Sequence, residues 1–397
     1  MSGLQTTAIQ SRRSLAAAIG CAAVAGVASG MTWPVLAIIL DRQGNDGTLI
    51  ALSSASQSVA VFVILPLAPR MLARWGFVRT TAVGIAGAVA MLLALPLVPN
   101  IYAWLPIRFL LGASTVVFYT ACEIWVNRLA AEESRGRTIG IFGFLWSGGF
   151  AAGPLIAAWT GTEGWAPFIA TAALMSAAAL PLLYAAEPPA AADEVTPGFF
   201  GFARYVGLAP ALLIAFLLLG ALDYTNDAFL ALYGLHHGLD QTQALALLTV
   251  LLAGYTIAHI PCGWLADRVD RRRLLLAMTA LAAAIYLAVP AVIGSVWLAW
   301  PVLFLAGCAL SGIWTAVVVL LGQRFAGAEL ASAYVASGIL YGSGSIAGPL
   351  LTGAIADSTS LAVVPLVLAG FCLIYLPVGL LRDRMLRSDP NNSRCDL

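Results

Sequence analysis

Uninterrupted apolar stretches long enough to cross a lipid bilayer recur from one end of this 397-residue chain to the other. A helix needs roughly twenty residues to span the hydrocarbon layer, because it rises about 1.5 Å per residue. Only 10% of the residues are charged, against roughly 25% in a soluble globular protein. The stretches are continuously apolar rather than alternating, which favours helices over a barrel. The sequence therefore predicts an all-α membrane protein.

About twelve such stretches can be distinguished. The predicted crossings cover approximately residues 15–40, 49–70, 79–98, 102–127, 139–160, 165–185, 209–232, 242–266, 274–294, 297–323, 331–355 and 361–381.

The placement of positive charge predicts the orientation of these crossings. All twenty positive side chains are arginine. If the N-terminus is cytoplasmic, nearly all of them fall in cytoplasmic loops, whereas Arg42 lies outside and Arg108 lies within a helix. Because cytoplasmic loops carry an excess of arginine and lysine, we expect a multi-pass protein of the bacterial inner membrane with both termini in the cytoplasm.

The chain also contains an internal repeat. The segment EPPAAADEVTPGFFGFAR, residues 187–204, interrupts the apolar pattern after the sixth predicted crossing. Shifting the chain against itself by about 194 to 196 positions places GFAAGPL, residues 149–155, on GSIAGPL, residues 344–350. We predict an N-terminal six-helix half over 1–186, a cytoplasmic linker over 187–206 and a C-terminal half over 207–397.

Three further motifs carry a resemblance to a known family. The segment GWLADRVDRR, residues 263–272, lies between the second and third crossings of the second half, and Arg108 is followed by Gly112 in the fourth crossing. The segment EIWVN, residues 123–127, ends that crossing. With the GFAAGPL segment, these features resemble the major facilitator superfamily, and EIWVN resembles a bacterial subgroup whose substrates are mostly unassigned.

This resemblance implies two pseudo-symmetric six-helix bundles around a central cavity lined mainly by the first, fourth, seventh and tenth helices. Transport would occur by alternating access, with energy from an ion gradient, most often of protons. The repeated loop motif would clamp the cytoplasmic ends of helices at an inner gate, and its residues are Asp267, Arg268, Arg271, Arg272 and, in the degraded first copy, Arg74.

Ionisable residues inside a predicted crossing each cost roughly 2.5–3.5 kcal/mol on insertion scales, and four of them are strong cases. They are Arg108, Glu123, Asp223 and Asp227. The two aspartates are four residues apart and share one helix face. Since like charges held close in a low-dielectric cavity favour protonation of one of them, we predict that this pair binds and releases a proton.

Arg108 and the two aspartates lie at similar depths from the outer ends of their helices. One hypothesis is that Arg108 pairs with Asp223 or Asp227 when the outer side is closed. The alternative is that Arg108 packs within its own half as a structural anchor. Glu123 lies about 22 Å from Arg108 along the same helix, where we expect an ion pair with Arg74, Arg79 or Arg137 at the inner gate, with proton carriage as the alternative.

Under the repeat, Ser29, Thr32 and Trp33 of the first crossing align with Asp223, Asn226 and Asp227 of the seventh. Polar side chains at matched depth are candidates for the substrate cavity, although serine and threonine in membrane helices also bond their own backbone. Gln57 is a weaker candidate of the same kind. His259 is expected to be a neutral histidine in the bundle, with a proton relay as the alternative.

Small residues predict close helix contacts in the fifth and eleventh crossings. The residues are Gly149 and Gly153 with Pro154, and Gly344 and Gly348 with Pro349. The prolines can bend these helices, because each removes a backbone donor.

The most favoured function is secondary active transport of a small solute, coupled to protons and directed towards efflux. The alternatives are uptake of a polar or cationic solute, or a non-transporting membrane sensor or scaffold. No phosphate-binding loop of the form GxxxxGK[ST] occurs, since the chain has no lysine. We expect no enzyme activity, cofactor, metal or nucleic-acid partner. The expected partners are the solute, a proton or other coupling ion and the lipid bilayer, with the protein acting as a monomer.

Overall fold

The computed structural model describes residues 2–64, 67–98, 100–129, 135–185, 208–325 and 327–387, and every regular element in these ranges is helical. Twelve helical segments are long and apolar enough to cross a membrane. The predicted linker, 187–206, lies outside the described residues.

The described residues of the first half form nine elements. They are α1 (Ser2–Arg42), α2 (Gly47–Ile64), α3 (Ala68–Trp75), α4 (Phe77–Ala94), the 3₁₀ turn η1 (Leu95–Leu97), α5 (Ile101–Leu129), α6 (Arg135–Thr160), α7 (Ala166–Ala177) and the 3₁₀ turn η3 (Leu180–Tyr184). The predicted second crossing extended to residue 70, but α2 ends at Ile64 and α3 is a separate short helix. Pro69 in its first turn suits a new helix start, because proline lacks a backbone donor.

The second half comprises seven elements. They are α9 (Pro210–His236), α10 (Gln241–Arg268), α11 (Arg271–Val292), α12 (Val296–Arg324), α13 (Gly327–Ser358), the 3₁₀ turn η5 (Leu361–Val363) and α14 (Val364–Arg387). Two starts follow from local chemistry. Asp240 caps α10 in a reciprocal capping box with Gln243, and Asp270 caps α11 by accepting from the backbone N–H of Arg273.

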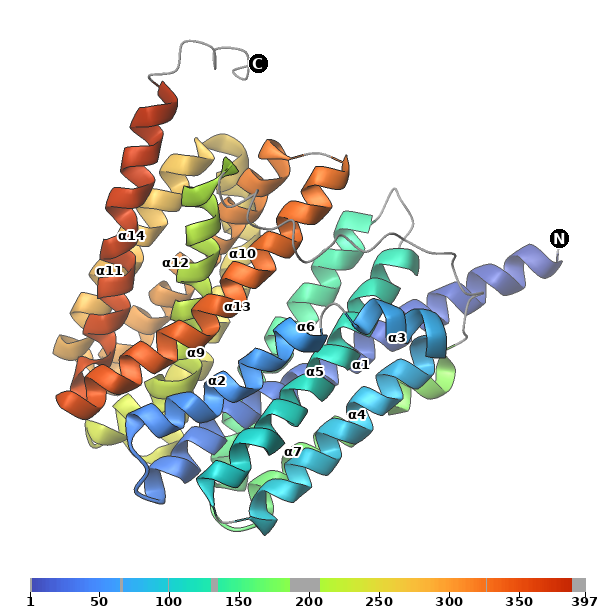
Figure 1. Ribbon diagram of the computed structural model, residues 1–397, viewed down its shortest axis with the longest axis horizontal. Helices are drawn as coiled ribbons and strands as arrows, with labels where there is room; N and C mark the ends of the chain where they lie inside the picture. The colour runs from blue at the N-terminus through green and yellow to red at the C-terminus, as the bar shows by residue number, and fades with distance from the viewer. Residues whose placement is uncertain are drawn as a thin grey trace.

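Equivalent helices pack together in the two halves. In the first half α1 packs on α6 and α2 on α5, and in the second α9 packs on α13 and α10 on α12. Figure 1 shows the blue-to-green helices gathered on one side and the yellow-to-red helices on the other. The fold is thus two six-helix bundles, as the sequence predicts, joined mainly where α2 contacts α13, α6 contacts α10 and α1 contacts α9.

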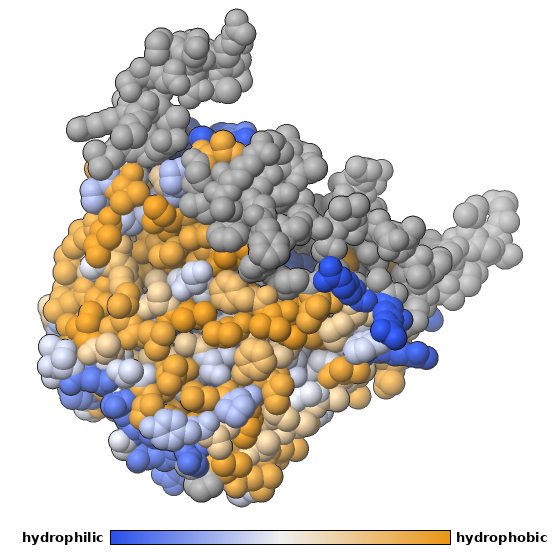
Figure 2. Space-filling view, viewed as in Figure 1, coloured by the Kyte–Doolittle hydropathy of each residue, from blue (hydrophilic) through white to orange (hydrophobic). Residues whose placement is uncertain are grey.

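The outer surface suits lipid rather than water. Figure 2 shows a broad apolar belt over the described residues, with hydrophilic residues towards opposite edges of the belt, at the lower left and at the upper right. Large apolar side chains on this surface include Trp159, Ile169 and Ile374, which are 85%, 54% and 71% exposed. Helix α1 begins and α14 ends at the same end of the bundle (Figure 1), which we call the terminal face; the opposite end is the distal face.

Candidate functional site: a cavity between the two halves

A two-chambered cavity lies between the six-helix bundles. The deeper chamber has a volume of about 270 Å³ and is lined by residues near the middle of α1, α2, α5, α6, α9, α10 and α13. A larger chamber of about 1120 Å³ lies towards the terminal face, where Glu123, Phe142 and His259 line it. The chambers are continuous, since Trp146, Tyr255 and other side chains line both.

The helices that line this cavity differ from those that the family resemblance implied. The second, fifth and eighth crossings contribute as much as the first, fourth and seventh, whereas the tenth and eleventh, α12 and α13, contribute one described residue each, Trp314 and Tyr341. The reason is geometric: the interface is formed by α2 on α13 and α6 on α10, so the inner faces of these helices also border the gap.

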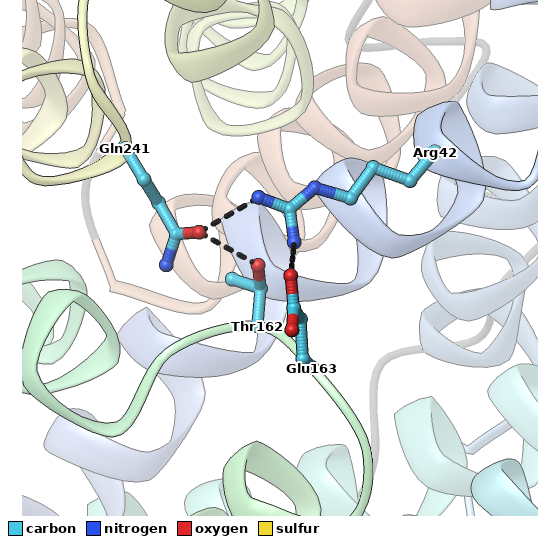
Figure 3. A network of polar contacts seen from close by, with 4 residues as sticks. All are labelled: Arg42, Thr162, Glu163 and Gln241. Atoms are coloured by element: carbon cyan, nitrogen blue, oxygen red, sulfur yellow. Dashed lines mark hydrogen bonds and ion pairs between the residues drawn. The ribbon is translucent and has the colours of Figure 1, made fainter.

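The two halves are joined at the distal face by polar contacts. The Arg42 guanidinium bonds Gln241 of the second half at 2.9 Å and Glu163 at 3.4 Å, and Thr162 donates to the same Gln241 oxygen at 3.0 Å (Figure 3). Gln241 opens α10, so this network ties the end of α1 and the loop after α6 to the second half.

A second contact between the halves caps a helix. The Asp357 carboxylate at the end of α13 accepts from the backbone N–H groups of Gly47 and Thr48 at 2.6 and 2.8 Å, and from the Thr48 hydroxyl. An anion suits this position, because the first N–H groups of α2 lack intrahelical partners. We call this contact, together with the Arg42 network, the distal clasp.

The predicted acidic pair lies in the deeper chamber. Asp223 and Asp227 both line it, and the Tyr341 hydroxyl of α13 donates to Asp223 at 2.9 Å. The carboxylate of Asp227 is 8% exposed and makes no hydrogen bond within the described ranges. The two carboxyls are close enough to interact electrostatically with each other and with Tyr224. Asp223 is also close enough to interact with Tyr255, Tyr286 and Tyr341.

Arg108 does not pair with either aspartate, although the distal face is closed. The guanidinium is fully buried and donates to Gln57 at 3.0 and 3.3 Å and to Ser53 at 3.1 Å, both on α2. The hypothesis of an Arg108–aspartate pair is therefore wrong for this state. The physical reason is that the guanidinium donors are used on α2. The Trp33 ring lies 5.3 Å from the guanidinium carbon and 5.0 Å from the Tyr224 ring.

The remaining polar candidates separate into two groups. Ser29 and Asn226 line the deeper chamber, and the Ser29 hydroxyl and the Asn226 carbonyl oxygen have no hydrogen-bond partner among the described residues. The amide nitrogen of Asn226 bonds the Leu222 carbonyl and the Tyr286 hydroxyl, which fixes its orientation. Thr32 instead donates to the Ala28 carbonyl of its own helix and does not line either chamber.

The candidates for the inner gate lie towards the terminal face. Glu123 is exposed at the wall of the larger chamber, while the side chain of its predicted partner Arg137 lies outside the described residues. Arg268 stacks on Trp264 at 3.6 Å, and Asp267 is exposed. Arg74 is exposed, and Arg271 and Arg272 are half-buried. A clamp by Asp267 stays a prediction, since no ion pair of Asp267 occurs among the described residues.

The glycine motifs lie at close helix crossings. A Cβ at Gly149 or Gly153 would overlap the backbone of α1, and one at Gly344 or Gly348 would overlap the backbone of α9. Pro154 and Pro349 continue inside α6 and α13, one turn or less beyond these contacts.

Sequence reasoning missed the aromatic lining and the distal clasp. Tyr224, Tyr255 and Tyr341 surround the acidic pair, but aromatic residues in apolar helices are usually core residues, so no local signal marks them. Asp357 could be recognised in the sequence as a charged residue near the end of a predicted crossing. Its partner, the start of α2, becomes apparent only when the two halves are placed together.

Comparison with known proteins supports this description. The sequence model that describes the Major Facilitator Superfamily matches residues 18–251 and 212–395 of this chain. An uncharacterized transporter of this type, YfkF of Bacillus subtilis, is 23% identical over 334 residues, which cover 83% of this chain and 85% of the relative. Another uncharacterized transporter of this type, from Yersinia pestis, is 26% identical over 290 residues, which cover 71% of this chain and 73% of the relative.

Solved structures show the same fold. The nucleoside transporter NupG superposes with a TM-score of 0.77 at 16% identity, covering 94% of this chain and 98% of NupG. A bacterial homologue of the human lysosomal transporter Spinster, solved in an inward-facing and unoccupied conformation, superposes with a TM-score of 0.77 at 15% identity. The match covers 93% of this chain and 95% of the homologue. With its twelve membrane-spanning helices, its two-bundle fold and a family match over most of its length, this chain belongs to the Major Facilitator Superfamily of membrane transporters, which are not enzymes.

Proposed function

We propose that this protein is a proton-coupled secondary transporter that exports a small solute across the bacterial inner membrane. In this proposal the terminal face is cytoplasmic, as the arginine distribution indicates. The solute enters the larger chamber from the cytoplasm, reaches the deeper chamber and leaves when the distal clasp opens. Motion of one bundle against the other provides this alternating access. The protein acts as a monomer, because each chain contains a complete cavity.

The acidic pair carries the proposal. Asp223 and Asp227 line a chamber that adjoins the larger one, and Arg108 is fully buried and uses its donors on Gln57 and Ser53. A buried carboxylate without a cationic partner is costly, so it is satisfied by a proton or by a solute. Competition between these two ligands for one pair of carboxyls couples their movements in opposite directions.

The test uses purified protein in vesicles that contain a trapped pH-sensitive dye and hold an imposed proton gradient. A solute panel that includes nucleosides, since the structural neighbour NupG is a nucleoside transporter, is added on each side in turn. A transported solute is expected to dissipate the gradient. The variants Asp223→Asn and Asp227→Asn are each expected to reduce the initial rate at least about tenfold, which corresponds to about 1.4 kcal/mol.

Asp240→Asn provides the matched control. Asp240 lies at the distal start of α10 outside both chambers, and asparagine caps a helix about as well as aspartate. Its rate should equal that of the natural protein. Proton movement that survives in the Asp223→Asn, Asp227→Asn double variant would overturn the coupling role. Faster dissipation when the solute is added at the distal side, with the gradient favouring entry, would instead indicate uptake.

A further inference from the structure

The deeper chamber presents acidic side chains and no basic one among its described lining residues. Asp223 and Asp227 line it, whereas no arginine or histidine of the described residues does. The chain has no lysine at all. Arg108 is fully buried and uses its donors on Gln57 and Ser53. A water-poor cleft lined by one sign of charge concentrates the opposite sign, so this cavity favours cations over anions.

Aromatic rings surround the acidic pair. Tyr224 lies between Trp33 and Tyr341, with ring centroids 5.0 and 6.1 Å away, and Trp314 follows 6.0 Å beyond Tyr341. All four rings line one or both chambers. Faces of tryptophan and tyrosine attract organic cations, and the same rings contact apolar groups. The series of rings continues from the acidic pair into the larger chamber.

The other polar groups near the acidic pair are neutral. Beside the carboxyls, the fully buried polar atoms of the deeper chamber that have no partner among the described residues are the Ser29 and Thr256 hydroxyls and the Asn226 carbonyl oxygen, all on residues at most 7% exposed. The acidic pair therefore supplies the charged groups of the described lining. No cluster of metal-ligating side chains occurs among the described residues.

We infer that the solute is an amphipathic organic monocation, bound with its positive group beside Asp223 and Asp227 and its apolar body against Trp33, Tyr224, Tyr341 and Trp314. This inference rests on the proposed transport function and specifies the chemical class of the solute. The aromatic rings select the apolar body, and the carboxylates select the sign of its charge.

The experiment measures equilibrium binding to the purified full-length protein of two probes that share one shape and differ in charge: tetraphenylphosphonium, a cation, and tetraphenylborate, an anion. The cation is expected to bind saturably, and the anion at least about a hundredfold more weakly. Asp227→Asn should weaken cation binding about tenfold or more, and Tyr341→Phe, which keeps the ring, should weaken it much less than Tyr341→Ala. Asp240→Asn should bind as the natural protein does. Thermal unfolding of each variant shows whether it is folded.

The outcomes separate the solute class from the transport function. Equal binding of cation and anion, or unchanged cation binding in folded Asp227→Asn, would overturn the inference. If the vesicle assay shows proton movement driven by an anionic or neutral solute, the solute class is wrong and the transport function stands. If tetraphenylphosphonium binds with the expected dependence on Asp227 and no solute moves protons, the transport function fails while the cation site stands.

Discussion

The guanidinium of Arg108 is held by neutral partners. Gln57 accepts from its Nε and Nη2 atoms through one carbonyl oxygen, and Ser53 accepts from Nη1. A charge at 0% exposure normally requires a counterion, and here amide and hydroxyl dipoles together with the Trp33 ring take that place. Arg108 thus anchors α5 on α2 inside the first half, the alternative that the sequence left open.

Substitution of Gln57 by alanine is therefore expected to destabilise the fold. Two donors of a buried cation would lose their acceptor, at about 2–3 kcal/mol, because hydrogen bonds to charged groups contribute about 1.5–3 kcal/mol. The measurement is the melting temperature of the purified protein in detergent. Gln57→Glu keeps an acceptor and adds a countercharge, so it should melt at or above the natural temperature. Equal melting of Gln57→Ala and the natural protein would show that water replaces the amide.

At the scale of elements, glycines set how closely α6 approaches α1. Gly149 faces α1 so closely that a Cβ would overlap the Ala23 carbonyl oxygen, while a Cβ at the neighbouring Gly148 would meet nothing within 4 Å. The same arrangement recurs where Gly344 faces Leu217 of α9. Because the neighbouring atoms are backbone, they cannot move aside without moving the helix.

These two adjacent glycines offer a matched pair of substitutions. Gly149→Ala is expected to force α6 away from α1 and to cost about 1–3 kcal/mol, as overpacking does. Gly148→Ala should leave stability unchanged or raise it slightly, because alanine favours helix more than glycine. Thermal unfolding and the yield of monodisperse protein would report the difference. If both variants behave alike, the contact between α1 and α6 is more compliant than its geometry indicates.

For the whole molecule, the distal clasp decides which face is closed. The ion pair between Arg42 and Glu163 is 40% and 90% exposed at its two side chains, so it contributes about 0–1 kcal/mol. Asp357 instead satisfies two backbone donors at the start of α2, a position where an anion contributes up to about 2 kcal/mol. Arg42 and Glu163 both belong to the first half, so Asp357, which joins the halves directly, is expected to hold the distal face closed more strongly than the ion pair does.

Removal of the Asp357 carboxylate should shift the protein towards a state open at the distal face. A loss of about 1–2 kcal/mol changes a two-state ratio roughly five- to thirtyfold. Spin labels on Gln43→Cys and Ser358→Cys, in a background without native cysteines, would measure the separation of the two halves there. Asp357→Ala should add a population with a longer distance between the two labels, whereas Glu163→Gln should change the distribution of label distances little.

Asp46 provides the control for this prediction. It caps α2 through the Leu49 N–H without contacting the second half, and asparagine preserves the cap. Asp46→Asn should therefore give the natural distance distribution. If it opens the distal face as much as Asp357→Ala does, the effect arises from the stability of α2 rather than from a contact between halves.

The sequence by itself determined the number of crossings, the two-bundle fold and the residues that cannot face lipid. Apolar length and the cost of burying charge are local properties, so they can be read from one segment at a time. This is why Asp223 and Asp227 could be placed in a cavity before any contact was known. The repeat between GFAAGPL and GSIAGPL likewise predicted equivalent helix crossings.

Only the tertiary structure decided which of these residues meet. Arg108 and the aspartates lie at similar depths in their helices, but depth fixes only the position along each helix. The packing of α5 on α2 places Gln57 and Ser53 beside Arg108, and the guanidinium donates to them instead. The ring of tyrosines around Asp223 and the clasp between Asp357 and α2 join residues 118 and more than 300 positions apart. Such contacts depend on how the two bundles dock, and no local pattern in the chain encodes that geometry.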